Sequence, residues 1–154
     1  MSVIHADFAI ERRYGCSPPQ TFSAFADPAL KRQWFAVPAD WAETDWTLDF
    51  RVGGGETNRG RSPDGKLHAF VSRFHDIVAE RRIVFAYDLL VDDQLVSVSL
   101  TTVEVFADGD GSRLLFTEQG AFFDEDPGAP AEREHGTGVI LDRLGPLLAG
   151  EPAR

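Results

Sequence analysis

The strongest constraint on the fold of this chain is a long region in which apolar and polar residues alternate. In its first segment Trp46, Leu48, Phe50 and Val52 alternate with polar residues, which is the period of a β-strand with one buried face. The pattern returns at residues 67–78, 83–90, 94–107 and 113–123. Turn sequences such as Ser-Pro-Asp-Gly at 62–65 and Asp-Gly-Asp-Gly-Ser at 108–112 separate the segments and suit antiparallel neighbours. The region therefore predicts an antiparallel sheet.

Helical signals flank this region. Residues 3–13 alternate loosely and predict one further strand. Ser17 and Asp27 then stand at N-cap positions, each followed by proline, and predict two short helices. Near the C-terminus a helical stripe of apolar residues follows, made of Val139, Ile140, Leu144, Leu147 and Leu148. The Gly145-Pro146 pair within it should kink this helix or end it early.

This order of elements predicts one α+β domain over residues 1–154. A strand, two short helices, about six antiparallel strands and one C-terminal helix follow each other without a linker or an internal repeat. Packing a single sheet against the long helix is the natural way to bury the apolar face of each.

A glycine-rich stretch from Gly53 to Ser62 has the spacing of a phosphate-binding loop, with arginine in place of the lysine. Such a loop needs a buried parallel strand before it and a helix directly after it, because the helix N-terminus holds the anion. Here the preceding strand carries Asp49 and Arg51, and a Pro-Asp-Gly turn follows. We therefore interpret the glycines as a turn or bulge between strands.

Charge and spacing argue against several other kinds of site. The chain has 25 acidic and 15 basic residues, a net charge of −10, which should repel nucleic acids and anionic membranes. Its single cysteine, Cys16, allows neither an internal disulfide nor a zinc site of paired cysteines. The four histidines, His5, His68, His75 and His135, lack metal-binding spacing. We expect no metal, no cofactor and no nucleic-acid partner.

The N-terminal sequence has no apolar signal core, and no apolar run approaches the ~20 residues that a membrane span requires. These observations predict a cytoplasmic protein without a membrane partner.

Six segments together resemble a known family. In chain order they are PPQTFSAFADPALKRQWF, DWTLDFRVGGGE, PDGK, ERRIVFAYDL, GSRLLFTEQGAF and EHGTGVILDRLGPLL. They resemble the activator of heat-shock-protein-ninety ATPase homologue-like family, within the START-like, Bet v 1-like (SRPBCC) superfamily. The resemblance implies a helix-grip fold, in which a curved antiparallel sheet of six to seven strands wraps around the C-terminal helix and leaves a cavity between them.

The strand periodicity predicts which residues would line such a cavity. The expected wall residues on the strands are Trp46, Phe50, Phe70, Phe74, Phe85, Tyr87 and Phe116. Trp34 and Phe35 would close one end, and Val139 and Leu144 would face the cavity from the C-terminal helix. Apolar walls with a few polar groups are typical of a small-molecule pocket. The alternative is that these aromatic residues fill the core and leave no room.

Polar residues at inward positions depart from the family pattern. Counting from the glycines places Glu56 and Asn58 inward, and Glu118 shares the parity of Phe116. With His68 and His135 they could form a polar cluster, in which a buried carboxylate has a raised pKa and could act as an acid or base. Alternatively, the first two lie at an open rim, or Glu118 pairs with an arginine such as Arg59. A register slip of one residue would turn Glu56 and Asn58 to the outward face of the sheet.

Three functions remain compatible with these observations. The first is a protein that binds a small hydrophobic or amphipathic molecule. The second is a START-like hydrolase or cyclase that uses Glu118, Glu56 or His135 as catalytic residues. The third is a regulator of a chaperone ATPase. We do not expect this function, because the family's founding members carry an additional N-terminal domain for chaperone binding, whereas this chain begins directly at its first predicted strand. The resemblance also suggests a homodimer.

Overall fold

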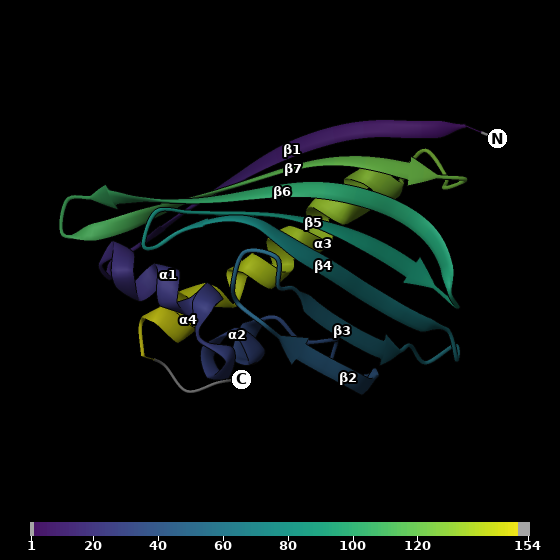
Figure 1. Cartoon of the computed structure of the whole chain (residues 1–154), viewed down its shortest axis with the longest axis horizontal. Coiled ribbons are helices and arrows are strands. Elements are labelled where there is room, and N and C mark those ends of the chain that lie inside the picture. Colours follow the sequence, from purple (N-terminus) through teal and green to yellow (C-terminus); the bar gives the residue numbers. More distant parts are fainter. Residues whose placement is uncertain (1, 151–154) are drawn as a thin grey trace.

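The computed structural model describes residues 2–150 and consists of one seven-stranded sheet curved around the C-terminal helix (Figure 1). The strands pair in the order β1-β7-β6-β5-β4-β3-β2, and every pairing is antiparallel. They are β1 Val3–Tyr14, β2 Ala42–Leu48, β3 Glu56–Arg61, β4 Leu67–Val78, β5 Arg82–Val91, β6 Gln94–Asp108 and β7 Gly111–Phe123. The predicted helix-grip fold is confirmed.

The helices lie on the concave side of this sheet and at one end of it (Figure 1). They are α1 Pro18–Ala26, α2 Pro28–Trp34, α3 Ala129–Asp142 and α4 Leu144–Leu148. In Figure 1, α3 crosses the concave face, whereas α1, α2 and α4 gather at one end. None of the helices in the described range 2–150 is long and apolar enough to cross a membrane.

The two short helices begin where their caps predict. Gln20 Oε1 accepts a hydrogen bond of 3.1 Å from the backbone N–H of Ser17, as in a capping box. At the next helix, Asp27 Oδ1 accepts one of 2.9 Å from the backbone N–H of Ala29. Proline follows both caps, where its missing N–H costs no helical hydrogen bond. The chain therefore turns twice within a few residues and covers the end of the sheet.

The glycine-rich stretch is a turn that folds back onto β4. Gly53 has a φ of +85°, and a Cβ on Gly55 would lie 2.0 Å from the carbonyl oxygen of Ser72. The backbones of this turn and β4 exchange hydrogen bonds of 2.9 Å between Gly53 and Phe74 and between Phe74 and Gly54. Val52, which was expected to share the buried face of Trp46, is instead 57% exposed, because the strand ends at Leu48.

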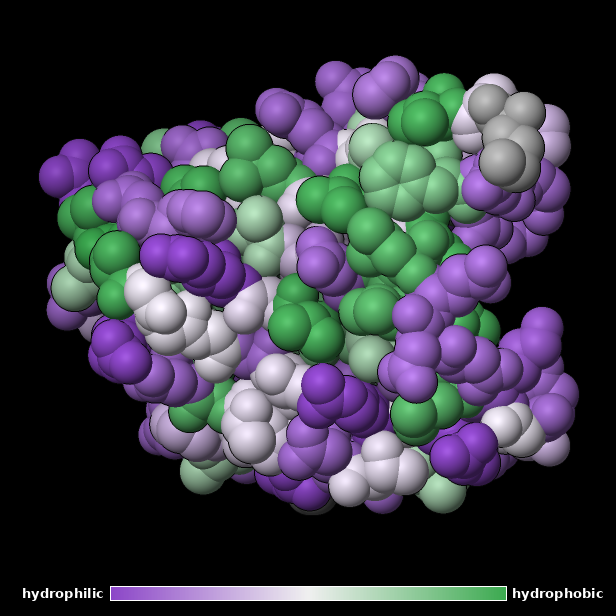
Figure 2. Space-filling model, turned by 45° about the vertical axis from the view of Figure 1, so that its right-hand side comes forward, coloured by the Kyte–Doolittle hydropathy of each residue, from purple (hydrophilic) through white to green (hydrophobic). Residues whose placement is uncertain are grey.

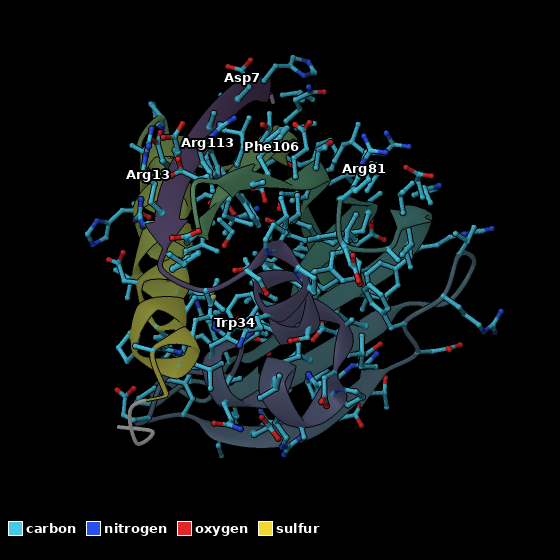
Figure 3. All side chains as sticks on the ribbon, turned by 90° about the vertical axis from the view of Figure 1, so that its left-hand side faces the viewer. Asp7, Arg13, Trp34, Arg81, Phe106 and Arg113 are labelled. Atoms are coloured by element: carbon cyan, nitrogen blue, oxygen red, sulfur yellow. The ribbon has the colours of Figure 1, made fainter. Side chains whose placement is uncertain are left out.

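The core fills only the end of the sheet that the short helices cover. Buried there are Phe22 and Phe25 of α1, Leu141 of α3 and Leu144 of α4. Trp34 lies between the short helices and the C-terminal helices (Figure 3); its Nε1 donates a hydrogen bond of 2.8 Å to the carbonyl oxygen of Ala24. This end of the molecule is therefore closed, and the opposite half of the concave face contains the cavity described below.

The C-terminal helix is interrupted, as the glycine-proline pair predicts. The first part ends at Asp142, and α4 begins at Leu144. Pro146 has no N–H to donate to the carbonyl of Asp142, and its ring would crowd that carbonyl in a continuous helix. The interruption lets α4 turn toward α1 and α2 and close the core.

Candidate functional site

A cavity of about 650 Å³ lies between the sheet and α3. Its size falls in the range of small-molecule sites. The short helices and the loop after them contribute Trp34, Phe35, Val37 and Trp41, the strands Phe70, Phe85, Tyr87, Phe116 and Phe122, and α3 Arg133, Thr137 and Ile140. In the space-filling view, hydrophobic side chains gather in a hollow bordered by hydrophilic ones (Figure 2).

Aromatic rings form a continuous wall along the sheet side of the cavity. The Phe70 ring lies 5.0 Å from that of Phe35 and 4.6 Å from that of Tyr87, centroid to centroid. Phe85 lies 6.2 Å from Tyr87 and continues the wall. Edge-to-face and tilted pairs at these separations are favourable. These ring contacts stabilise the wall, and the cavity lies between the wall and α3.

A buried polar cluster centred on Glu118 stands on the same wall. Glu118 is 3% exposed and accepts hydrogen bonds of 3.0 Å from Tyr87 Oη and 3.1 Å from Thr101 Oγ1. Burial raises the pKa of Glu118, while the nearby Arg133 guanidinium and the two hydroxyl donors oppose that rise. Burial, together with the Glu118 charge, also raises the pKa of Tyr87. The Tyr87 hydroxyl therefore keeps its proton and donates a hydrogen bond to Glu118.

Arg133 brings α3 into this cluster. Its two terminal nitrogens donate hydrogen bonds of 2.9 Å to Tyr87 Oη and to Ser97 Oγ, and one of them lies 4.0 Å from Glu118 Oε2. The partner of Glu118 is thus Arg133 and not Arg59, which pairs with Asp45. Arg133 was not among the residues predicted from the sequence, although its spacing of four and seven from Thr137 and Ile140 puts it on the inward face of α3.

A second buried ion pair lies next to the cavity. Lys31 Nζ donates a hydrogen bond of 2.8 Å to Glu56 Oε1, with both side chains at most 7% exposed. Trp46 Nε1 donates one of 3.1 Å to Glu56 Oε2. The ammonium group also lies 4.8 Å from the centroid of Phe35, a distance suited to a cation–π contact. Lys31 lines the cavity, whereas Glu56 lies behind it.

Asn58 and His68 supply the remaining polar groups at this part of the wall. Asn58 is 8% exposed, and its Oδ1 has no hydrogen-bonding partner within the described part of the chain. His68 Nε2 lies 3.1 Å from Ser62 Oγ, and its ring lies 4.4 Å from that of Trp41. Burial lowers the pKa of His68 below its ordinary 6.5, so the ring is mostly neutral at pH 7.

The structure brings together only part of the residues named from the sequence. Eight of them line the cavity: Trp34, Phe35, Asn58, Phe70, Phe85, Tyr87, Phe116 and Glu118. His68, named as a possible member of the polar cluster, also lines it.

Trp46 and Glu56 lie behind the cavity wall in the ion-pair cluster, and Phe50, Phe74 and Leu144 belong to the packed core or its edge. Phe50 lies beyond the end of β2, and its ring contacts Phe22 and Phe74 instead of the cavity.

His135 and Val139 do not line the cavity, so their predicted position is wrong. Both are exposed, and both lie with Ile10 and Arg12 along the opposite side of α3, facing β1. The inward face of the helix carries Arg133, Thr137 and Ile140, and a residue two positions from Thr137 points away from that face. No cluster of metal-binding side chains occurs within residues 2–150.

Comparisons with known proteins agree with this architecture. A protein from Rhizobium loti is 46% identical to this chain, with a TM-score of 0.85 over 94% of this chain and 97% of the other. A protein from Rhizobium leguminosarum is 40% identical, with a TM-score of 0.90 over 97% and 98%. An AHSA1 protein from Silicibacter pomeroyi shares the fold, with a TM-score of 0.75 at 22% identity over 94% and 98%.

Among curated proteins, no match to this chain is found. The family model described as "Activator of Hsp90 ATPase homolog 1-like protein" matches residues 16–149. This match includes both short helices, the glycine turn, the strands that carry the cavity wall and both C-terminal helices. The chain therefore belongs to the family of Activator of Hsp90 ATPase homolog 1-like proteins.

Proposed function

We propose that this protein binds a small, largely apolar molecule in the cavity between the sheet and α3. The observation that carries the proposal is a volume of about 650 Å³ walled by aromatic rings. A chain that needed only a stable core would gain free energy by closing this space, because empty apolar volume is costly. A ligand that fills the space recovers those contacts.

The hydrogen bonds of Glu118 favour binding over acid–base catalysis. Thr101 occupies one carboxylate oxygen and Tyr87 the other, and Arg133 lies beside the second. A general acid or base must reach the substrate with a free oxygen or proton. The arrangement supports a role in which Glu118 holds Tyr87 and Arg133 in place at one side of the cavity.

A variant that fills the cavity tests the proposal. Gly136 of α3 lines the cavity, and a Cβ there would meet no atom within 4 Å. Gly136→Leu should therefore fold normally and even gain up to about 1 kcal/mol, because glycine is a poor helix former. Its new side chain would occupy the cavity and should abolish binding. Gly138→Leu is the matched control on the β1-facing side of α3, where a Cβ would be 3.6 Å from Arg12.

Native mass spectrometry and a thermal-shift screen of hydrophobic compounds give the readout. A compound at a hundredfold excess over its dissociation constant stabilises the protein by about 2.7 kcal/mol, or roughly 5–10 °C for a chain of this size. We expect such a shift in wild type and Gly138→Leu but not in Gly136→Leu. No shift with any compound would overturn the proposal and make stimulation of a chaperone ATPase, the activity in the family's description, the next function to test. Homodimer formation stays a prediction.

A further inference from the structure

Both positive side chains at the cavity wall, Lys31 and Arg133, are already paired with a buried carboxylate. Lys31 is hydrogen-bonded to Glu56, and Arg133 faces Glu118 across 4.0 Å. Burial lowers the pKa of His68 below its ordinary 6.5, so its ring is mostly neutral at pH 7. An anionic ligand group would therefore enter a poorly hydrated space without a free cation among the described wall residues, and burying an unpaired charge is strongly unfavourable.

The N-terminal part of α3 adds a barrier for anions. Glu125 precedes this helix and Glu132 lies in its first turn, and both line the cavity at its more exposed side. Neither carboxylate forms an ion pair within the described residues. An approaching anion would meet their negative charge, in a protein whose net charge is −10, before it reached the interior.

Asn58 is a buried polar side chain at the wall with unused hydrogen-bonding capacity. Its side chain points into the cavity from the centre of β3, and its Oδ1 is buried without a partner in the described part of the chain. An amide offers an acceptor beside a donor. Rotating the amide group by half a turn exchanges its oxygen and its nitrogen, so an acceptor still stands beside a donor. A buried polar group without a partner destabilises a fold, so a ligand that pairs with it gains correspondingly.

The neighbours of Asn58 are aromatic. Phe70 stands opposite it on β4, and the Phe70 ring is flanked by Phe35 and Tyr87. A planar group held at Asn58 would lie against this wall, where ring contacts are favourable.

We infer that the ligand is an aromatic molecule that carries no anionic group and has a carboxamide or lactam edge, and that this edge pairs with the side-chain amide of Asn58. The edge presents one N–H beside one carbonyl oxygen, which is the complement of the asparagine amide. This inference rests on the proposed function and adds to it the chemical class of the ligand and the residue that selects it.

The test uses compounds that share one apolar body. Biphenyl-4-carboxamide is compared with its N,N-dimethyl amide, with biphenyl-4-carboxylate and with unsubstituted biphenyl, by isothermal titration calorimetry at pH 7. The carboxamide should bind at least about tenfold more tightly than the other three, since one or two buried hydrogen bonds correspond to that factor. The dimethyl amide keeps the carbonyl oxygen and loses the N–H, so comparing it with the carboxamide measures what the ligand's N–H contributes to binding.

Variants then assign the effect to Asn58. Asn58→Leu should weaken carboxamide binding by about tenfold or more, leave biphenyl binding within a factor of about three and raise the melting temperature, because an unpaired polar group is removed. If Asn58 served only to stabilise the fold, Asn58→Leu would lower the melting temperature instead. Gln119→Leu removes an exposed amide on β7 and should change nothing. Asn58→Asp puts a charge in place of the donor and should also weaken carboxamide binding. It replaces Asn58→Leu in the test if that variant does not fold.

The outcomes separate the two proposals. Equal binding of biphenyl and the carboxamide would overturn the inference and leave the proposed function standing. Tighter binding of the carboxylate would overturn the claim that the ligand carries no anionic group. Unchanged carboxamide binding in both Asn58 variants would remove that residue from the site. No binding by any of the four compounds, together with no thermal shift in the wider screen, would overturn both proposals.

Discussion

Replacing Lys31 by methionine should strongly destabilise the fold, because it leaves the Glu56 carboxylate buried without its cation. The two side chains are 7% and 3% exposed, and 2.8 Å separates Nζ from Oε1. Removing one partner of a buried ion pair costs about 3–5 kcal/mol. Trp46 Nε1 still donates to the other oxygen, and methionine keeps most of the apolar contacts of the lysine stem. We therefore expect a loss near the lower end, about 3 kcal/mol.

Urea unfolding followed by tryptophan fluorescence measures this loss, and the melting temperature should fall by roughly 6–12 °C. The double variant Lys31→Met, Glu56→Gln removes the stranded charge and keeps an oxygen for Trp46, so it should recover most of the stability. Arg51→Met is the matched control, because the Arg51–Asp49 pair is exposed and should contribute less than about 1 kcal/mol.

Two results would refute this reasoning. A loss below about 1 kcal/mol in Lys31→Met would mean that Glu56 is solvated when the lysine is absent. A double variant no more stable than the single one would mean that packing of the lysine stem, and not its charge, is what the fold requires.

Three further perturbations have defined outcomes. Because burial raises the pKa of Glu118 above its ordinary 4.5, the folded state binds that proton more tightly; wild type should lose stability relative to Glu118→Gln as pH rises from 4.5, measured by urea midpoints across pH. Tyr87→Phe removes a donor to Glu118 and an acceptor for Arg133 and should cost about 1–3 kcal/mol by the same assay. Gly55→Ala would place its Cβ 2.0 Å from the Ser72 carbonyl oxygen and should cost about 3 kcal/mol in calorimetry.

The sequence predicts the fold well because its signals are local. The caps at Ser17 and Asp27 act within one helical turn, and the strand alternation needs no knowledge of distant residues. The same holds for the break in the C-terminal helix, which follows from the proline at position 146. The inward position of Glu56 and Asn58 also follows from counting along β3, where both are buried.

The site is predicted less completely because its polar contacts join segments far apart in the sequence. Lys31 meets Glu56 across 25 positions, and Arg133 meets Tyr87 across 46; no local pattern predicts which charges pair. The misplacement of His135 and Val139 has a different cause. Their helix contains two glycines and few apolar residues, so its sequence gives only a weak indication of which face turns inward.

That weak pattern has a consequence for how a molecule reaches the interior. Within α3, all of which the structure describes, Leu141 near the C-terminal end is the one buried residue. The side-chain hydrogen bonds that join the N-terminal half to the sheet both come from Arg133. The N-terminal half of α3 can therefore move away from the sheet while Leu141 stays packed in the core. This movement breaks the Arg133 hydrogen bonds but needs no global unfolding, so amide hydrogens of the N-terminal half of α3 should exchange well before those of β6.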